Sequence, residues 1–294
     1  MIRKGKEILF LNSIKLKNSF GPLIYYYFQN KSIFLYYSDF NSNWGDAVNK
    51  FFIESIAGRK VISSKRVYNL LGRHEITGIG SILSSDLSNK IIWGSGFIKP
   101  PSTYIQPPIK ILALRGKLSG KLLESSGIED PGIYGDPALL FPEVYLPRIH
   151  KKYSIGIIPH YTELKRFKEN QDFINSKDIK IISPLVSNSN FLEMVNLINE
   201  CEIIFSSSLH GLILADAYKI PSLRFSFKDN SIIGGDFKFE DYYSGVGIES
   251  HDKFVMGSIS DFSKQEIYRR ANLKNIDFNA SLLKNSLLNF IDEK

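Results

Sequence analysis

Short apolar segments alternate along this chain with longer stretches whose apolar residues recur at helical spacing. The apolar segments predict β-strands at residues 33–37, 76–79, 91–93 and 109–114 in the first half of the chain, and at 153–158, 179–182, 202–205 and 222–225 in the second. Helices are expected between them, at about 51–58, 117–124, 191–200 and 209–219. This alternation predicts the α/β fold class, with parallel sheets whose strands are buried between helices.

The two series of strands indicate two domains. A chain of 294 residues is longer than one comfortable hydrophobic core requires. We therefore predict an N-terminal lobe over residues 33–147 and a C-terminal lobe over residues 148–294, both Rossmann-like, with an interdomain cleft between them. The Pro-containing stretch 141–147 is the expected linker, and residues 239–294 are expected to be helical with loops, ending in closing helices that pack on either lobe.

Residues 1–32 form a basic and aromatic extension ahead of the first predicted strand. Lysines such as Lys15 and Lys17 alternate there with aromatic residues such as Phe20 and Tyr25. Two interpretations stay open, namely an arm that lies on an anionic membrane surface and an ordered extension packed on the first lobe.

Composition and charge narrow the class of protein. The formal net charge of +7 and the pI of about 9.2 favour an acidic partner, which means a phosphorylated metabolite, an anionic membrane surface or nucleic acid. Nucleic acid is disfavoured because the basic residues are scattered and no reader module is recognisable. No segment approaches the ~20 uninterrupted apolar residues of a membrane-spanning helix, and no signal peptide is recognisable. The single cysteine, Cys201, adjoins an apolar run and is expected to be buried, in a reducing, cytoplasmic compartment.

Most predicted strands end in glycine, serine or a charged residue. In an open parallel sheet, ligands bind outside the carboxyl ends of the strands, where loops and helix N-termini meet. Gly80 and Ser81 follow one predicted strand, and Gly94 and Ser95 follow the next. These are short loops through which a phosphate or a sugar can approach the backbone, although neither matches Gly-x-Gly-x-x-Gly or a Walker loop.

The strongest local signal is a buried strand that runs through three hydroxyls directly into a helix. Ser206, Ser207 and Ser208 occupy the start of that helix, and His210 lies in its first turn. Free backbone N–H groups and the helix dipole favour an anion there, and the serines can cap the helix or bind phosphate oxygens. A bound phosphate would favour the protonated imidazole, which makes His210 a candidate general acid. The alternative is a histidine that caps the helix or packs against it.

Two charged residues at strand ends in the first half are further candidates. Arg115 follows a predicted strand, where its guanidinium can hold a carboxylate or phosphate through two parallel hydrogen bonds. A salt bridge to Asp136 or Glu124 is the structural alternative for Arg115. Asp46 lies at the first strand-to-helix turn, where it either caps the helix or accepts a proton from a sugar hydroxyl.

Other chemistries lack their motifs. No His, Cys, Asp or Glu cluster has the spacing of a metal site, and neither a Gly-x-Ser-x-Gly elbow nor a dinucleotide fingerprint is present in the sequence. We therefore expect neither a metal ion nor a bound cofactor.

Seven short motifs, in order along the chain, resemble those of the polysaccharide pyruvyl transferase family, and within it most closely the ketal-forming succinoglycan type. The likeness extends from about residue 36 to residue 247. The motifs are Asn43-Trp44-Gly45-Asp46, Gly78-Ile79-Gly80-Ser81-Ile82-Leu83, Trp93-Gly94-Ser95-Gly96, Leu114-Arg115-Gly116, Tyr134-Gly135-Asp136-Pro137-Ala138, Pro159-His160-Tyr161 and Ser207-Ser208-Leu209-His210-Gly211.

The resemblance implies a glycosyltransferase-B-like (GT-B-like) arrangement of two Rossmann lobes, phosphoenolpyruvate as donor substrate and no metal requirement. It also implies a saccharide acceptor, carried on a lipid phosphate at the inner membrane face, where the basic protein would make peripheral contact. The catalytic residues would be His210, Arg115 and Asp46. The residues expected to bind substrate are Asn43, Gly45, Gly80, Ser81, Gly94, Ser95, His160, Ser206, Ser207, Ser208, Gly211 and Lys238.

One departure from the family pattern matters for the donor. Many members carry an arginine where this chain has Ser208. The donor phosphate would then need another cation, for which Lys238 and Arg224 are the candidates. Asp46 or His160 would accept the proton of the sugar hydroxyl.

Two other functions stay open on the sequence. The first is a nucleotide-sugar-dependent glycosyltransferase of the same architecture in polysaccharide assembly, because a fold does not determine its chemistry. The second is a carbohydrate- or anion-binding module without turnover.

Overall fold

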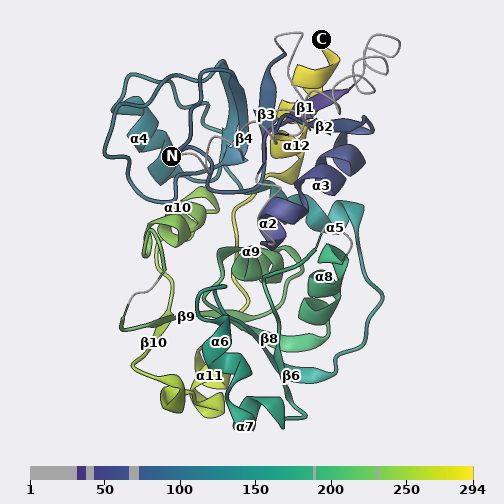
Figure 1. Ribbon diagram of the computed structural model, residues 1–294, viewed down its shortest axis with the longest axis vertical. Coiled ribbons are helices and arrows are strands. Elements are labelled where there is room, and N and C mark those ends of the chain that lie inside the picture. Colours follow the sequence, from purple (N-terminus) through teal and green to yellow (C-terminus); the bar gives the residue numbers. More distant parts are fainter. Residues whose placement is uncertain (1–31, 38–42, 66–72, 188–189, 230–231, 294) are drawn as a thin grey trace, which may run out of the picture.

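Two parallel β-sheets, one from each half of the chain, form the framework of the computed structural model (Figure 1). The structure describes residues 32–37, 43–65, 73–187, 190–229 and 232–293, so the predicted arm before Ser32 lies outside the described residues. The α/β class predicted from the alternating pattern is confirmed, and the two five-stranded sheets are consistent with two Rossmann-like lobes.

The N-terminal sheet has the strand order β2-β1-β3-β4-β5, and all its neighbouring strands are parallel. Numbered from the start of the lobe, this is the order 2-1-3-4-5. The elements of this half are β1 (Ile33–Leu35), α2 (Trp44–Ala47), α3 (Asn49–Ala57), β2 (Val61–Ser63), β3 (Glu75–Thr77), β4 (Lys90–Ser95), β5 (Lys110–Leu114), α4 (Lys117–Glu124), the 3₁₀ helix η1 (Pro137–Leu140) and α5 (Phe141–Val144).

The C-terminal sheet has the order β10-β9-β8-β6-β7, again with parallel neighbours throughout. Counted from β6 it repeats the order of the first sheet. The elements of this half are β6 (Tyr153–Ile158), α6 (Leu164–Lys168), α7 (Gln171–Ile174), β7 (Ile179–Ile181), α8 (Phe191–Asn199), β8 (Cys201–Ser206), α9 (Leu209–Ala217), β9 (Ser222–Phe227), α10 (Phe237–Gly245), β10 (Lys253–Met256), η2 (Ile259–Asp261), α11 (Lys264–Arg270) and α12 (Ala280–Asp292).

Both sheets reverse their winding at the same place, between the first and third strands of each lobe. In the N-terminal lobe β1 lies beside β3, with Leu35 opposite Ile76. In the C-terminal lobe β6 lies beside β8, with Ile155 opposite Ile203. The crevice outside the carboxyl ends of strands at such a reversal is where open α/β sheets bind their ligands. The topology therefore predicts a site at the ends of these four strands.

The two lobes share a hydrophobic core around Trp44. The indole packs edge-on against Phe141 with 5.2 Å between ring centroids. Its Nε1 donates to the carbonyl of Phe191 at 3.0 Å, and its backbone N–H donates to the carbonyl of Pro184 at 2.9 Å. A buried aromatic side chain removes 150–250 Å² from water, so at roughly 25 cal/mol per Å² each ring contributes several kcal/mol to this contact.

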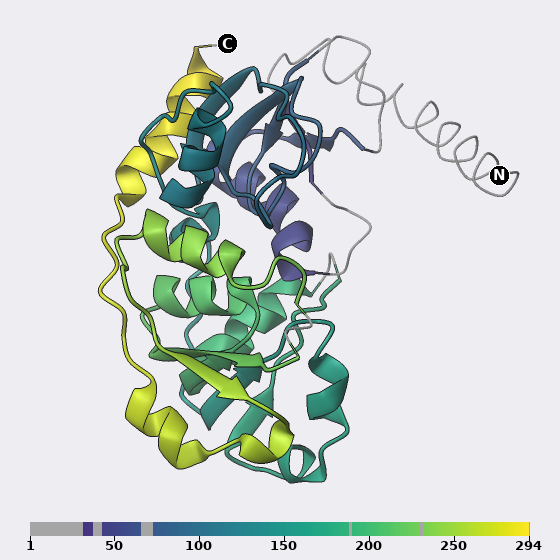
Figure 2. The same ribbon diagram turned by 90° about the vertical axis from the view of Figure 1, so that its left-hand side faces the viewer.

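The chain returns to the N-terminal lobe at its end. Figure 2 shows the segment after α11 running along the molecule to α12, which packs on the N-terminal lobe. Leu283 and Leu287 are fully buried there, and Nε1 of Trp93 donates to the carbonyl of Leu283 at 2.9 Å. The amphipathic spacing predicted this helix and left open on which lobe it packs.

Two local features differ from the sequence prediction. β2 and β10 were not predicted, because they are edge strands of 3 and 4 residues and so carry too little pattern to recognise. The expected linker 141–147 begins as the short helix α5, whose Phe141 is fully buried.

Cys201 is buried as expected, and burial raises the pKa of its thiol to about 12. Across the described ranges, no helix combines the length and apolar character of a membrane span.

Candidate functional site

A cavity of about 440 Å³ opens at the carboxyl ends of the four strands where the sheets reverse. Residues of both lobes line it. Tyr36 follows β1, Gly80 and Ser81 follow β3, His160 follows β6, and Ser208 and His210 follow β8. A volume of this size suits a small metabolite together with part of a second substrate.

The cavity brings together many of the residues singled out in the sequence. Those that line it are Asn43, Asp46, Gly80, Ser81, His160, Ser208, His210 and Lys238. The remaining predicted site residues are not among the lining residues, namely Gly45, Gly94, Ser95, Arg115, Ser206, Ser207 and Gly211.

His210 reaches from the C-terminal lobe to the backbone of α2. A Cβ on Gly45 would lie 2.1 Å from Cε1 of the imidazole, so only glycine permits this approach. Nε2 of His210 is buried and has no hydrogen-bond partner in the described part of the chain. Burial, helped by the charges of Arg115 and Lys238, lowers the pKa of His210 to about 3. With only protein around it, the imidazole is therefore uncharged at neutral pH.

The start of α9 leaves backbone donors without protein acceptors. The N–H groups in the first turn of an α-helix lack an intrahelical partner. Ser208 is the N-cap residue of α9, yet its side chain makes no capping hydrogen bond. In the described residues, no other side chain accepts from the N–H groups of Leu209, His210 or Gly211. This helix start therefore retains the capacity to bind an anion.

The three serines before α9 have different roles. The hydroxyl of Ser206 donates to the carbonyl of Ile158 at 2.9 Å, and that of Ser207 donates to the carboxylate of Glu163 and accepts from the N–H of His160. Both serines are fully buried. Only Ser208 faces the cavity, so the protein itself uses two of the three hydroxyls that were expected to bind substrate.

Lys238 brings a buried positive charge to the cavity. It lies on α10 and exposes 7% of its surface. Its Nζ forms no hydrogen bond and no ion pair with any residue that the structure describes. Burial lowers the pKa of Lys238 to about 8, with smaller contributions from Arg115 and Arg224 and an opposing one from Glu163. A buried ammonium without a counter-ion is costly, so this position favours a bound anion.

Asp46 faces the cavity from α2. Its carboxylate makes no hydrogen bond within the described residues, so the helix-capping alternative does not apply. Burial raises the pKa of Asp46 to about 7, and the charge of Lys65 opposes that shift. A carboxyl group with this pKa can both accept and donate a proton near neutrality.

His160 is held in place from two sides. Its Nδ1 lies 2.8 Å from Oγ1 of Thr162, and its ring packs against Tyr161 at a centroid distance of 4.4 Å. Burial and the charge of Lys238 lower the pKa of His160 to about 4. The imidazole is uncharged at neutral pH and can accept a hydrogen bond or a proton.

Arg115 lies behind the cavity wall and is fully buried. Its Nε donates to Oδ2 of Asp241 at 2.9 Å, and its Nη1 donates to Oγ of Ser81 at 2.7 Å. The salt-bridge partner is therefore Asp241 from α10, rather than Asp136 or Glu124. The guanidinium does not line the cavity itself. It acts there through its hydrogen bond to Ser81 and through its charge.

Other expected contacts are also made within the protein. Ser95 Oγ donates to the carbonyl of Gly78, and Gly94 packs against Pro137. Arg224 pairs with Asp236 and stacks on Phe239, so of the two proposed cations only Lys238 lines the cavity.

Several lining residues were not predicted from the sequence. They are Tyr36, Lys65, Ile82, Ser84, Ser85, Ile98, Tyr161, Leu209 and Ile233. Ser84 and Ser85 directly follow the recognised segment 78–83, which could have indicated them. Lys65 carries no such local signal. Within the described ranges, no three His, Cys, Asp or Glu side chains cluster as metal ligands would.

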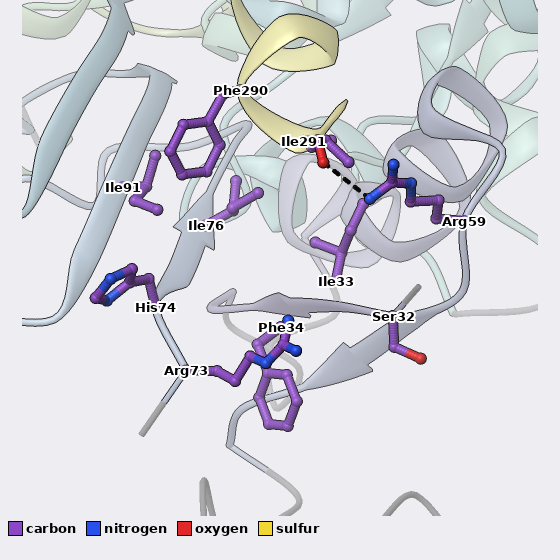
Figure 3. Close-up of a pocket in the computed structure, with 10 residues that line it drawn as sticks. All are labelled: Ser32, Ile33, Phe34, Arg59, Arg73, His74, Ile76, Ile91, Phe290 and Ile291. Atoms are coloured by element: carbon purple, nitrogen blue, oxygen red, sulfur yellow. Dashed lines mark hydrogen bonds between the residues drawn. The ribbon is translucent and has the colours of Figure 1, made fainter. Parts of the chain in front are cut away.

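A second cavity, of about 390 Å³, lies at the amino ends of strands in the N-terminal sheet (Figure 3). Ile33, Ile76 and Ile91 line it from the starts of β1, β3 and β4. Arg59 closes one side by donating to the carbonyl of Ile291 at 3.0 Å and pairing with Asp292. None of the seven sequence motifs reaches this cavity.

Comparison with known proteins agrees with the placement of the motifs. A sequence profile of the polysaccharide pyruvyl transferase family matches residues 23–229. An uncharacterised protein of Acanthamoeba polyphaga mimivirus is 29% identical over 262 residues, which cover 87% of this chain and 88% of that protein. The crystal structure of a functionally uncharacterised protein from Klebsiella pneumoniae superposes with a TM-score of 0.46 at 14% identity, over 80% of this chain and 96% of that one.

The family profile spans well over half of the chain and includes the ends of β1, β3, β6 and β8, whose residues line the cavity between the lobes. This chain therefore belongs to the polysaccharide pyruvyl transferase family, and it is a transferase that acts on polysaccharide.

Proposed function

We propose that the protein transfers the pyruvyl group of phosphoenolpyruvate onto two hydroxyls of one sugar, forming a pyruvate ketal and releasing phosphate. The sugar belongs to a surface polysaccharide or to its lipid-linked precursor. A GT-B-like closure of the lobes around the donor and independence from a metal ion are parts of this proposal. The observation that carries it is the buried, unpaired Lys238 in the same cavity as the uncapped start of α9.

Phosphoenolpyruvate suits the charge of this cavity because it carries a carboxylate and a phosphate on a small frame. Lys238 and the N–H groups at the start of α9 would bind its anionic oxygens, with Ser81 and Ser208 as hydroxyl donors. Arg115 adds positive potential from behind Ser81. A trianion beside His210 would favour the imidazolium, raising a pKa that burial holds near 3.

The reaction balances with two proton transfers. A proton moves to the methylene carbon of the donor, and one sugar hydroxyl adds to the central carbon. The C–O bond to phosphate then breaks, and the second hydroxyl of the same sugar adds to that carbon and closes the ketal. Of the two hydroxyl protons, one is balanced by the new methyl group and the other leaves with phosphate. His210 is the proposed acid, and Asp46, whose pKa is about 7, is the proposed base.

The outer part of the cavity suits a sugar. Asn43, Ser84 and Ser85 offer hydrogen bonds to hydroxyls, and Tyr161, which is 42% exposed, offers an aromatic face. The net charge of +7 would favour an acceptor on a lipid phosphate and peripheral contact with the anionic inner face of the membrane.

The test is phosphate release from phosphoenolpyruvate over a panel of lipid-linked and synthetic glycosides, with thermal stabilisation as the binding measurement. We expect phosphoenolpyruvate, but not nucleotide sugars, to stabilise the protein, and a chelator to leave turnover unchanged. Lys238→Met should raise KM for phosphoenolpyruvate roughly 10- to 100-fold, because it removes a charge-assisted contact. Lys117→Met, at an exposed lysine in the first turn of α4, is the matched control.

Two results would contradict the proposal. Stabilisation by nucleotide sugars alone would favour a glycosyltransferase. Stabilisation by phosphoenolpyruvate or by a glycoside without any phosphate release would favour a binding module.

A further inference from the structure

Helix α10 extends from the C-terminal lobe to the N-terminal lobe, where it packs against α4 (Figure 1). Lys238 and Asp241 lie three residues apart on α10, so they project from the same side of the helix. Lys238 lines the cavity, whereas Asp241 is fully buried against the first lobe. One helix therefore carries both a cavity cation and a contact to the opposite wall.

Four donors of the N-terminal lobe converge on the carboxylate of Asp241. Its Oδ2 accepts from Nε of Arg115 at 2.9 Å and from Oγ of Ser119 at 2.8 Å, and it lies 2.8 Å from Nη2 of Arg115. Its Oδ1 accepts from the N–H of Ser119 at 2.7 Å. Asp241 thus caps the start of α4, whose own N-cap residue, Gly116, has no side chain to do so.

The packing around this carboxylate allows little freedom. A Cβ on Gly116 would lie 1.6 Å from the carbonyl oxygen of Asp241, and one on Gly245 would lie 2.1 Å from the carbonyl oxygen of Arg115. Backbone contacts this close require glycine at both positions. The register of α10 on the first lobe, and with it the position of Lys238, is therefore set by this contact.

The contact also reaches the other wall of the cavity. Arg115 donates through Nη1 to Oγ of Ser81 at 2.7 Å and through Nη2 to the carbonyl of Phe97. Ser81 lines the cavity. The carboxylate of Asp241 therefore orients the guanidinium that orients Ser81.

We propose that Asp241 is a positioning residue for pyruvyl transfer, which fixes Ser81 through Arg115 on one wall of the donor site and Lys238 through α10 on the other. This inference rests on the proposed function. The carboxylate of Asp241 also has an electrostatic role, because it compensates the buried charge of Arg115. Without that compensation, the guanidinium would act more strongly on Lys238, which also faces His160, His210, Arg224 and Glu163.

Asp241→Asn tests the role because it keeps the shape and removes the charge. We expect KM for phosphoenolpyruvate to rise roughly 10- to 100-fold, with a smaller change in kcat. Because Lys238 must be charged to bind the donor, kcat/KM should fall as the pH rises past the pKa of Lys238. We expect this fall to begin at lower pH in Asp241→Asn, because uncompensated Arg115 disfavours the charged form of Lys238. Glu240→Gln, at an exposed carboxylate on the same helix, should match the wild type in both respects.

A second variant separates positioning from stability. Replacing the pair by Arg115→Met with Asp241→Leu removes both buried charges, an exchange that often preserves or raises stability. We expect this double variant to keep its urea midpoint and still to show the raised KM. A double variant with wild-type KM and pH profile would overturn the proposal, as would an Asp241→Asn variant with those properties.

Binding of inorganic phosphate, followed by thermal shift across pH, distinguishes this inference from the proposed function. If the wild type binds phosphate without turning over phosphoenolpyruvate, the proposed function fails. Asp241→Asn should then lose phosphate binding at a lower pH than the wild type does. The same pH dependence in both proteins would overturn the role of Asp241. If the wild type neither turns over nor binds phosphate, there is no donor site, and the role of Asp241 is overturned as well.

Discussion

The starts of helices α4 and α9 are built alike and used differently. Each helix follows the carboxyl end of a buried parallel strand, and each has an N-cap residue that makes no side-chain capping bond. At α4, Asp241 and Ser244 from the opposite lobe accept from the N–H groups of Ser119 and Leu118. At α9, no side chain of the described residues takes that place.

The difference shows how one local arrangement can either join the lobes or leave backbone donors open to an anion. A helix start attracts an anion in both cases. At α4, Asp241 supplies the anion and Ser244 a hydroxyl, so two of the first three N–H groups have acceptors and the lobes are joined. At α9, where the nearby buried cation Lys238 also has no counter-ion among the described residues, the surroundings favour an anion from a substrate.

The largest effect is expected from the imidazole at the start of α9. His210→Asn removes the proposed acid but keeps a polar side chain beside Gly45. We expect kcat for phosphate release to fall by about 10²- to 10⁴-fold, the usual contribution of a positioned acid. Initial rates at saturating phosphoenolpyruvate measure this.

The control is His74→Asn, because His74 lines the second cavity, where none of the motifs lies. It should keep the wild-type rate. A His210→Asn enzyme that folds normally and keeps kcat within a few-fold of the wild type would exclude His210 as the acid.

The second-largest effect is expected from a carboxylate at the start of α9, like the one that Asp241 provides at α4. Ser208→Asp places a carboxylate at the N-cap of α9, where it can accept from the free N–H groups and pair with Lys238. We expect stability to rise by up to about 1 kcal/mol and KM for phosphoenolpyruvate to rise on the order of tenfold or more, because the new carboxylate competes with the donor. Urea unfolding and steady-state kinetics measure the two quantities.

Ser208→Asn provides the neutral counterpart, since asparagine also caps helices but carries no charge. It should be stabilising with a smaller change in KM. If Ser208→Asp neither stabilises the protein nor weakens the donor, then the start of α9 is not an open anion site, and the contrast with α4 fails.

The sequence predicted those features whose determinants are local. The helix predicted at 117–124 and the strand predicted at 153–158 match α4 and β6, because apolar spacing within each segment decides them. The edge strands β2 and β10 were not predicted, because each contains too few residues to show a recognisable pattern. Eight of the fifteen predicted site residues line the cavity, since parallel strands place their carboxyl ends together.

Long-range partners could not be predicted in this way. Ser206, Ser207 and Ser208 look equivalent in sequence, and their different roles depend on Ile158 and Glu163, which lie more than 40 residues away. Arg115 looked like a donor ligand because its partner Asp241 is 126 residues distant. Whether a charged group is paired or open depends on such contacts, and local patterns do not contain them.

The pH dependence of kcat/KM gives the smallest effect and contrasts the two helix starts most directly. Burial raises the pKa of Asp46 to about 7, so below that pH the proposed base is protonated and kcat/KM should fall about tenfold per pH unit. The pKa of Lys238 is lowered to about 8, so above that pH the donor-binding cation is lost and kcat/KM should fall again. The profile should therefore be a narrow bell between these values.

Asp46→Asn should be slower and should lack the acid limb, whereas Ser244→Ala, which alters the α4 contact, should keep both limbs. A wild-type profile that is flat from pH 6 to 9 would show that neither group titrates in the free enzyme as the cavity requires.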